Sequence, residues 1–186
     1  MNNHSLLTKL LNILRKSRQH RWISLLMDLL VMAIVVWGFQ LWQTRNLLPE
    51  NGTLPAPDFE LTALDGKRYR LSEQKGSQVF LYFFAPWCQV CSLNVSNLAD
   101  LKQAREDEGL IIWLVALSWD NPNQVQKFAE KHDIRLPILL GNAEVSGNFR
   151  IQAFPTWYVI NRDGMVLDSV VGYSPAWIMR WKTFNI

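Results

Sequence analysis

The chain has 186 residues and a formal net charge of +3, and it contains only two cysteines. Five of its basic residues precede an apolar stretch at 22–42, so the part after this stretch, with 14 basic and 15 acidic residues, is close to neutral. No basic stripe remains there that would indicate nucleic-acid binding, and no glycine-rich loop indicates phosphate binding.

The apolar stretch at 22–42 predicts a transmembrane anchor. As a helix it would extend about 30 Å, the thickness of a bilayer's hydrocarbon core, with Trp22 and Trp42 at the two interfaces. Its one carboxylate, Asp28, lies under two turns from Trp22 and can reach the interface, or it marks a contact between helices. The basic residues of segment 1–21 predict a cytoplasmic N-terminus and export of the remainder.

A cleaved secretory signal is the alternative to an anchor. Its apolar region would be shorter, and small residues would follow it, whereas here Gln43 to Leu48 follow. We therefore expect an uncleaved anchor at 22–42, a linker at 43–56 and one domain at 57–186. About 130 residues suffice for one well-buried domain and are too few for two.

Within the domain, the two cysteines are three residues apart, at Cys88 and Cys91. The apolar run 79–84 predicts a buried strand before them, and the spacing of apolar residues predicts a helix at about 89–106. A CxxC pair between a strand and a helix indicates a dithiol redox centre. Unpaired amides at the start of a helix stabilise a thiolate, so we expect Cys88 to attack and Cys91 to resolve, with no organic cofactor.

Three other readings of the pair compete with this one. A structural disulfide would gain little from closing so short a loop. A zinc site usually needs four ligands, and the only histidines are His4, His20 and His132. Two inert buried thiols would not explain the flanking Trp87, which suits a rim position.

The remaining elements follow in alternation. We expect an N-terminal hairpin, then a strand at 110–117, and a helix that opens at Asn121-Pro122 and ends by His132. A strand near 137–140, a helix near 143–149, a hairpin of 156–160 with 165–171 and a final helix from about 174 come next. This order predicts an α/β fold with a central mixed sheet covered on both faces. His132 is expected to be a solvated cap residue. Packing in the core or at its rim, rather than ligand stacking, is predicted for five tryptophans, at 113, 119, 157, 177 and 181.

Together, the FxxWCxxC motif from Phe84 to Cys91 and the Phe154-Pro155-Thr156 segment resemble the thioredoxin superfamily, and within it the membrane-tethered TlpA/ResA-like thiol–disulfide oxidoreductases. The segments 57–61 and 64–67 are similar to the N-terminal hairpin of this branch. The resemblance implies a thioredoxin-like fold over about 55–184. It also implies a cis-proline at Pro155 that faces the CxxC, and a substrate-binding role for Phe154 beside Trp87.

Two positions depart from the family pattern. Thioredoxin has a buried aspartate at the position of Tyr82, and ResA-like proteins often have a glutamate at the position of Asn94. In such proteins these carboxylates shuttle the proton of the resolving thiol, so the general base for Cys91 is unassigned here. The residues between the cysteines, Gln89 and Val90, match neither thioredoxin nor the oxidant DsbA, so they do not indicate the redox potential.

These features predict a protein thiol–disulfide oxidoreductase, anchored in a bacterial inner membrane with its domain in the periplasm. The resemblance favours a reductase of protein disulfides that receives electrons from a membrane donor of the DsbD kind, and a finer resemblance is to ScsD-like proteins. A Cu(I)-binding protein that uses the same dithiol, and a dedicated disulfide oxidase, are the alternatives.

Overall fold

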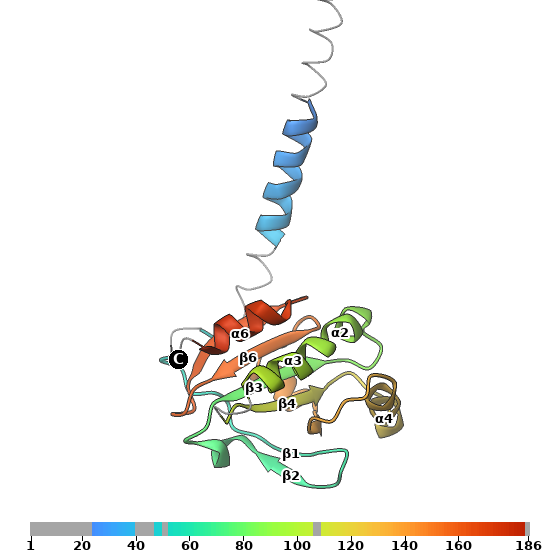
Figure 1. Cartoon of the computed structure of the whole chain (residues 1–186), viewed down its shortest axis with the longest axis vertical. Coiled ribbons are helices and arrows are strands. Elements are labelled where there is room, and N and C mark those ends of the chain that lie inside the picture. The colour runs from blue at the N-terminus through green and yellow to red at the C-terminus, as the bar shows by residue number, and fades with distance from the viewer. Residues whose placement is uncertain (1–23, 40–46, 50–51, 106–108, 185–186) are drawn as a thin grey trace, which may run out of the picture. The chain divides into compact units, whose positions relative to one another are not determined.

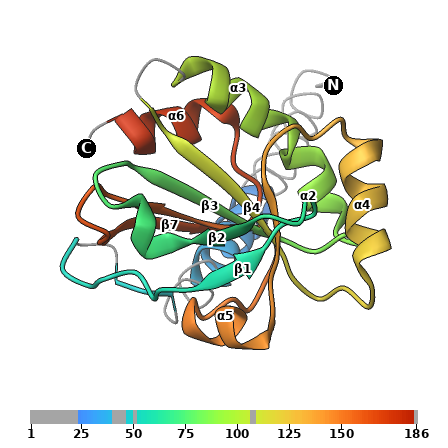
Figure 2. The same cartoon turned by 90° about the horizontal axis from the view of Figure 1, so that it is seen from below.

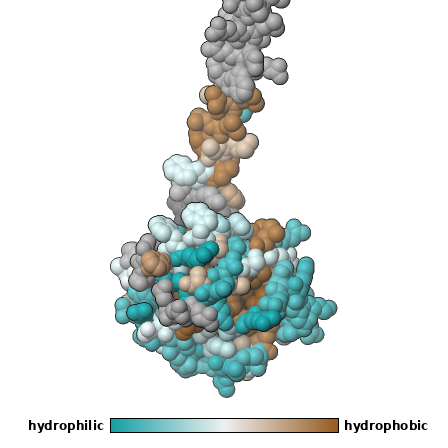
Figure 3. All heavy atoms as spheres, viewed as in Figure 1, coloured by the Kyte–Doolittle hydropathy of each residue, from teal (hydrophilic) through white to brown (hydrophobic). Residues whose placement is uncertain are grey.

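The computed structural model describes residues 24–39, 47–49, 52–105 and 109–184. The chain divides into two compact units, Met1–Arg45 and Asn46–Ile186. In the first unit, residues 24–39 form a helix whose side chains are all exposed and largely apolar (Figure 3). Within the described residues, no helix combines the length and the apolar character that a membrane span requires. The ends of the predicted anchor, 22–23 and 40–42, lie outside the described residues, as does the basic segment 1–21.

The second unit is built on a five-stranded mixed sheet of order β5-β4-β3-β6-β7. The central strand, β3 (Val79–Phe84), runs parallel to β4 (Ile111–Ala116) and antiparallel to β6 (Thr156–Ile160). The outer strands are β5 (Ile138–Leu140) and β7 (Val166–Val171), and a separate hairpin is formed by β1 (Glu60–Thr62) and β2 (Arg68–Arg70).

Helices cover both faces of this sheet (Figures 1 and 2). One face carries α2 (Gln89–Asn94), α3 (Ser96–Ala104), α4 (Pro122–Lys131) and α6 (Ala176–Phe184). The other face carries α5 (Ala143–Asn148) and the β1-β2 hairpin, which is followed by the 3-10 turn η1 (Leu71–Gln74). The predicted α/β order and the mixed sheet covered on both faces are confirmed.

The central strand β3 divides the core into two clusters. Its six residues are all buried, and alternate side chains point to opposite faces of the sheet. Phe80, Tyr82 and Phe84 enter the cluster under α2, α3 and α6. Leu81 and Phe83 enter the cluster under α5 and the hairpin. Burial on both faces explains why the sequence of β3 is an unbroken apolar run rather than an alternating one.

The helix expected at 89–106 is broken into two. The pattern of backbone hydrogen bonds along the helix tightens at Val95, where the Leu98 amide donates to the Val95 carbonyl in an i→i+3 bond. The break falls beside Asn94, whose buried side chain accepts hydrogen bonds instead of facing solvent. The helix opening at Pro122 is confirmed, and Asn121 occupies its N-cap position without a side-chain capping bond.

Two predictions about aromatic residues hold only in part. Trp113 and Trp157 are buried as expected, but Trp177 and Trp181 on α6 are exposed and do not pack in the core. His132 is the C-cap residue of α4 as predicted, but it is half-buried rather than solvated, because its ring lies against Phe128 with a centroid distance of 4.6 Å.

The segment before β1 is built into the second unit. Leu47 and Leu48 are buried in the cluster under α5. Further along, the Gly52 amide donates to the Val166 carbonyl at 3.0 Å, and the Val166 amide donates to the Leu54 carbonyl at 2.9 Å. Residues 52–55 therefore run along the outer edge of β7.

Candidate active site

The two cysteines lie where β3 ends and α2 begins, as the sequence predicts. Cys88 is the N-cap residue of α2 and has an extended backbone, and Cys91 is in the first turn of the helix. The two residues form a disulfide, with their Cα atoms 5.2 Å apart. The part of the chain that the structure describes has no group of three or more His, Cys, Asp or Glu side chains that could hold a metal ion.

The two cysteines differ in exposure and in contacts. Cys88 retains 7% of its surface in contact with solvent, whereas Cys91 has none. The backbone N–H of Cys91 donates to the Cys88 sulfur at 3.1 Å. This amide is one of the helix donors that lack an intrahelical partner, and such a donor stabilises negative charge on the atom it faces. After reduction, the outer sulfur is therefore the one at which a thiolate is favoured.

The loop before β6 brings the predicted substrate-binding residues to the dithiol. The Phe154–Pro155 peptide bond is cis, as the resemblance implies. Because Thr156 pairs with Phe83, Pro155 lies level with the last residue of β3, just before the cysteine loop. The Phe154 ring meets the Trp87 ring edge-on, with a centroid distance of 5.9 Å.

Trp87 is held at the surface by a contact that sequence reasoning missed. Its indole Nε1 donates to the carbonyl of Ser118 at 3.0 Å, while most of its ring is exposed. Ser118 follows β4 and has a positive φ of 53°. The acceptor is a backbone carbonyl, 31 positions away, so no side-chain pattern in the sequence could have indicated it.

The two positions that depart from the family pattern lie together beneath the disulfide. Tyr82 and Asn94 are buried in the same region of the core as Cys91, and Asn94 follows Cys91 by three residues, on the same side of α2. Burial raises the pKa of the Tyr82 phenol, and the neighbouring Asn94 side chain lowers it by less. No Asp or Glu is buried within the described residues. The resolving thiol therefore has neutral polar groups below it, and the described residues place no buried carboxylate there.

Asn94 also joins the dithiol helix to the loop that precedes α6. Its Oδ1 accepts from the backbone amide of Ser174 at 3.1 Å and from Asn97 Nδ2 at 3.2 Å. Asn97 Nδ2 in turn donates to the Ser174 carbonyl, and Trp157 Nε1 donates to the Ser174 hydroxyl, each at 3.0 Å. Sequence reasoning missed this link between α2, β6 and the loop before α6.

We expect Asn94→Leu to destabilise the oxidised protein by about 1–3 kcal/mol, because it leaves the buried Ser174 amide without its acceptor. Urea unfolding would measure the loss, with Asn123→Leu as the control, since that asparagine is exposed on α4 and undergoes the same change of side chain. Equal midpoints for the two variants would contradict a structural role for the Asn94 link.

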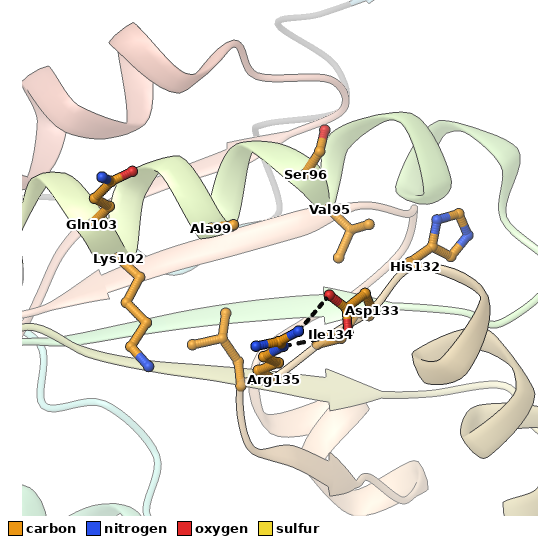
Figure 4. A pocket seen from close by; sticks show the side chains of 10 residues that line it. Val95, Ser96, Ala99, Lys102, Gln103, His132, Asp133, Ile134 and Arg135 are labelled. Atoms are coloured by element: carbon orange, nitrogen blue, oxygen red, sulfur yellow. Dashed lines mark hydrogen bonds and ion pairs between the residues drawn. The ribbon is translucent and has the colours of Figure 1, made fainter.

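A cleft of about 350 Å³ lies elsewhere, between α3 and the loop that follows α4 (Figure 4). Its rim carries Lys102 and the ion pair of Arg135 with Asp133, and His132 lies at one end. Neither cysteine lines it, so this hollow is separate from the dithiol. Burial lowers the pKa of His132, and the charge of Lys131 lowers it further.

The lowered pKa of His132 predicts a loss of stability in weak acid. The unfolded chain binds a proton at His132 near pH 6.5, before the folded protein does, so the stability that depends on neutral His132 is full above that pH and lost as pH falls through the lower folded value. We expect His132→Gln to remove this part of the pH dependence. Free energies of unfolding at a series of pH values between neutral and weakly acidic would test this; a difference between wild type and variant that is constant with pH would contradict it.

Sequence comparisons find relatives that are named as thioredoxin-like proteins or thiol–disulfide oxidoreductases. A profile of the AhpC/TSA family matches residues 53–169. The chain is 29% identical over 148 residues to the thioredoxin-like protein YneN of Bacillus subtilis, covering 77% of this chain and 86% of the relative. It is 28% identical over 159 residues to the thiol–disulfide oxidoreductase ResA of Bacillus cereus, covering 83% and 90%.

Solved structures agree on the fold. A candidate thiol:disulfide interchange protein DsbE from Chlorobium tepidum superimposes with a TM-score of 0.66 at 25% identity, covering 73% of this chain and 95% of the other. StoA from Bacillus subtilis superimposes with a TM-score of 0.61 at 21% identity, covering 69% and 97%. The thioredoxin-like fold expected from the resemblance is confirmed.

The matched family spans most of the chain, and the relatives named as oxidoreductases match a region that includes the CxxC pair. The chain therefore belongs to the AhpC/TSA family and is a protein thiol–disulfide oxidoreductase of the ResA and DsbE type.

Proposed function

We propose that this oxidoreductase reduces disulfides of exported proteins while anchored to the bacterial inner membrane, with Cys88 as the attacking and Cys91 as the resolving thiol. The observation that carries the assignment of roles is the inequivalence of the two sulfurs. Cys88 reaches the surface and accepts the Cys91 amide, and Cys91 is enclosed. A buried thiol can attack a bond to its neighbour but not the disulfide of another protein.

The reaction follows from these roles. The Cys88 thiolate attacks one sulfur of a substrate disulfide, so a mixed disulfide forms and the other substrate sulfur leaves as a thiolate. Cys91 then loses its proton and attacks the Cys88 sulfur, which releases the second substrate thiolate. Two electrons have passed to the substrate, whose sulfurs take up two protons, and the protein ends as the Cys88–Cys91 disulfide. A membrane electron donor of the DsbD kind would return it to the dithiol.

The substrate segment would lie against the loop before β6. Phe154 and Pro155 would present backbone to it, and the exposed face of Trp87 would contact it beside Cys88. The edge-on contact of the Trp87 ring with the Phe154 ring supports this arrangement. Large flat rings held by fixed partners offer contact area at little entropic cost.

The sequence and one structural feature support the membrane anchor. Residues 24–39 form a helix whose largely apolar side chains are exposed, a feature that suits a lipid environment (Figure 3). The five basic residues before it, and the absence of acidic ones, favour a cytoplasmic N-terminus and a periplasmic domain. Alkaline phosphatase fused to the C-terminus would be active in this topology, and an inactive fusion in a stable protein would contradict it.

Equilibration of the Cys88–Cys91 pair with glutathione tests the direction of electron flow. A reductase has a potential well below the periplasmic average, whereas a value above it would make the protein an oxidase. The copper alternative is tested on the reduced protein: tight, stoichiometric Cu(I) retention without any reduction of insulin would replace the proposal with a metal-binding function.

A further inference from the structure

The helix α6 has an exposed aromatic stripe that no part of the oxidoreductase reaction uses. Trp177, Trp181 and Phe184 are 66%, 61% and 68% exposed. Their spacing of four and three residues places them on one side of the helix. The opposite side is buried through Met179 and Thr183, so the stripe faces away from the core.

The charged residues of α6 are all basic. The helix contains Arg180 and Lys182 and no acidic residue. Lys182 is engaged by Asp168 of β7, while Arg180 is exposed. Tryptophan is the residue type that concentrates at membrane–water interfaces, and basic side chains are attracted to anionic lipid headgroups. A short helix with both features matches the composition of helices that lie in the plane of a membrane surface.

The length of the tether favours a lipid surface over a soluble partner. The predicted anchor ends at Trp42, and Leu47 is already buried in the second unit, so only residues 43–46 connect them. Fully extended, the chain from Trp42 to Leu47 spans roughly 18 Å. An anchored domain is therefore held close to the bilayer, and some part of its surface must face the lipid headgroups.

After Leu47 and Leu48, which are buried on the α5 face of the sheet, the chain runs along the edge strand that α6 also contacts. Residues 52–55 bond to the start of β7, and α6 is joined to the same strand by the Lys182–Asp168 ion pair. The segment that follows the tether and the helix that carries the aromatic stripe thus contact the same edge strand, β7.

We propose that Trp177, Trp181 and Phe184 form a surface that docks on the phospholipid headgroup region of the membrane to which the chain is anchored. This inference rests on the proposed membrane anchor. Docking on this side fixes how the domain is oriented above the bilayer, so that Cys88 meets its partners in a restricted geometry.

Photo-crosslinking of the full-length protein in nanodiscs of phosphatidylethanolamine and phosphatidylglycerol tests the surface. The probe is a phospholipid that carries a diazirine in its acyl chain close to the glycerol backbone. Trypsin separates the regions of interest, because cleavage at basic residues gives the peptides 22–45, 163–180 and 76–102. The first contains the anchor, the second contains Trp177, and the third contains Trp87, an exposed tryptophan of equal accessibility that serves as the internal control.

We expect lipid adducts on 22–45 and on 163–180 at Trp177, and none on 76–102. The double variant Trp177→Ser/Trp181→Ser should lose the α6 adducts and keep those on the anchor, whereas Trp87→Ser should change neither. Both variants are made in the full chain, and circular dichroism checks that the double variant is folded.

The remaining outcomes distinguish the proposed membrane anchor from the proposed docking surface. Adducts on 22–45 with none at Trp177 would overturn the docking surface and leave the anchor in place. Adducts at Trp177 without any on 22–45 would reject the anchor and support docking by α6 itself. Equal labelling of 163–180 and 76–102 would overturn the docking surface.

Discussion

Cys88→Ser should lower the reduction of insulin to the uncatalysed background, because the variant retains only a sulfur that has no contact with solvent. Cys91→Ser should also stop turnover, but for a different reason. It keeps the surface sulfur, so it attacks a substrate disulfide once and cannot complete the cycle. The expected product is a stable mixed disulfide with one insulin chain, visible as a mass increase of the protein that dithiothreitol reverses.

The two variants are matched controls for each other, since both lack the Cys88–Cys91 disulfide and each replaces one sulfur by one oxygen. Any difference between them reports the position of the remaining thiol rather than the loss of the cross-link. Adduct formation by Cys88→Ser and none by Cys91→Ser would reverse the assigned roles. Adducts at equal rates would show that burial of Cys91 does not limit its access.

The same Cys91→Ser variant would identify the clients of the protein. Expressed in a bacterial host, it should retain proteins with a transiently exposed cysteine as mixed disulfides. Wild type in the same host should retain far fewer, because Cys91 releases each one. Capture that is equal in wild type and variant would show that resolution does not depend on Cys91.

Local patterns predicted the elements that carry the dithiol. The six-residue apolar run gives β3 because a strand buried on both faces must be apolar throughout. The hairpin of β6 and β7 follows from two apolar runs around Asn161–Gly164, where Asn161 Oδ1 accepts from the amides of Asp163 and Met165. Cys88, Cys91 and the cis-proline came from motifs whose members lie within a few residues of each other.

Such local patterns could not predict contacts between residues that are far apart in the sequence. The bond from the Ser174 amide to Asn94 joins positions 80 apart, and one of its atoms is backbone, so no periodicity records it. The break of the predicted helix at Val95 lies beside this contact. It could not be placed from the sequence because the apolar spacing continues through α3.

The sequence left open which side of α6 is exposed, for a different reason. Its sequence has apolar residues on both sides of the helix, with Met179 inside and Trp177 and Trp181 outside, so hydrophobic spacing alone does not indicate which side packs. Only the position of the sheet decides it. Large apolar residues whose place in core or rim the sequence does not decide, and which the structure leaves exposed, are therefore the first place to search for an interaction surface.

Phe149→Ala should destabilise the protein by about 3–5 kcal/mol, a larger loss than that expected for Asn94→Leu. Phe149 has no solvent contact, and its ring lies against Phe83 of the central strand at a centroid distance of 5.1 Å. It also contacts Phe59 at 5.9 Å and Tyr158 at 5.5 Å. Removal of the ring leaves a cavity between the sheet and the segment that follows α5.

The backbone around Phe149 limits how far the cavity can collapse. The Phe149 amide donates to the Val145 carbonyl at 3.0 Å, and its carbonyl accepts from the Tyr158 hydroxyl at 2.7 Å. These bonds hold the Cα of residue 149 in place, so the neighbouring rings cannot close the gap without losing them. Because the backbone is fixed, we expect a loss of unfolding free energy in the upper part of the range for this substitution.

Urea unfolding of the oxidised full-length protein in detergent would measure the effect, with Phe184→Ala as the control. That change removes the same ring from an exposed position, where the Arg105 guanidinium lies 5.4 Å from the ring centroid, and should cost about 1 kcal/mol or less. Since domains of this size have only about 5–15 kcal/mol of stability, Phe149→Ala removes a large fraction of it. If that variant fails to fold, Phe149→Leu, which leaves a smaller cavity, should still shift the midpoint more than Phe184→Ala. Equal midpoints for the buried and exposed substitutions would show that the ring cluster around Phe149 does not hold α5 on the sheet.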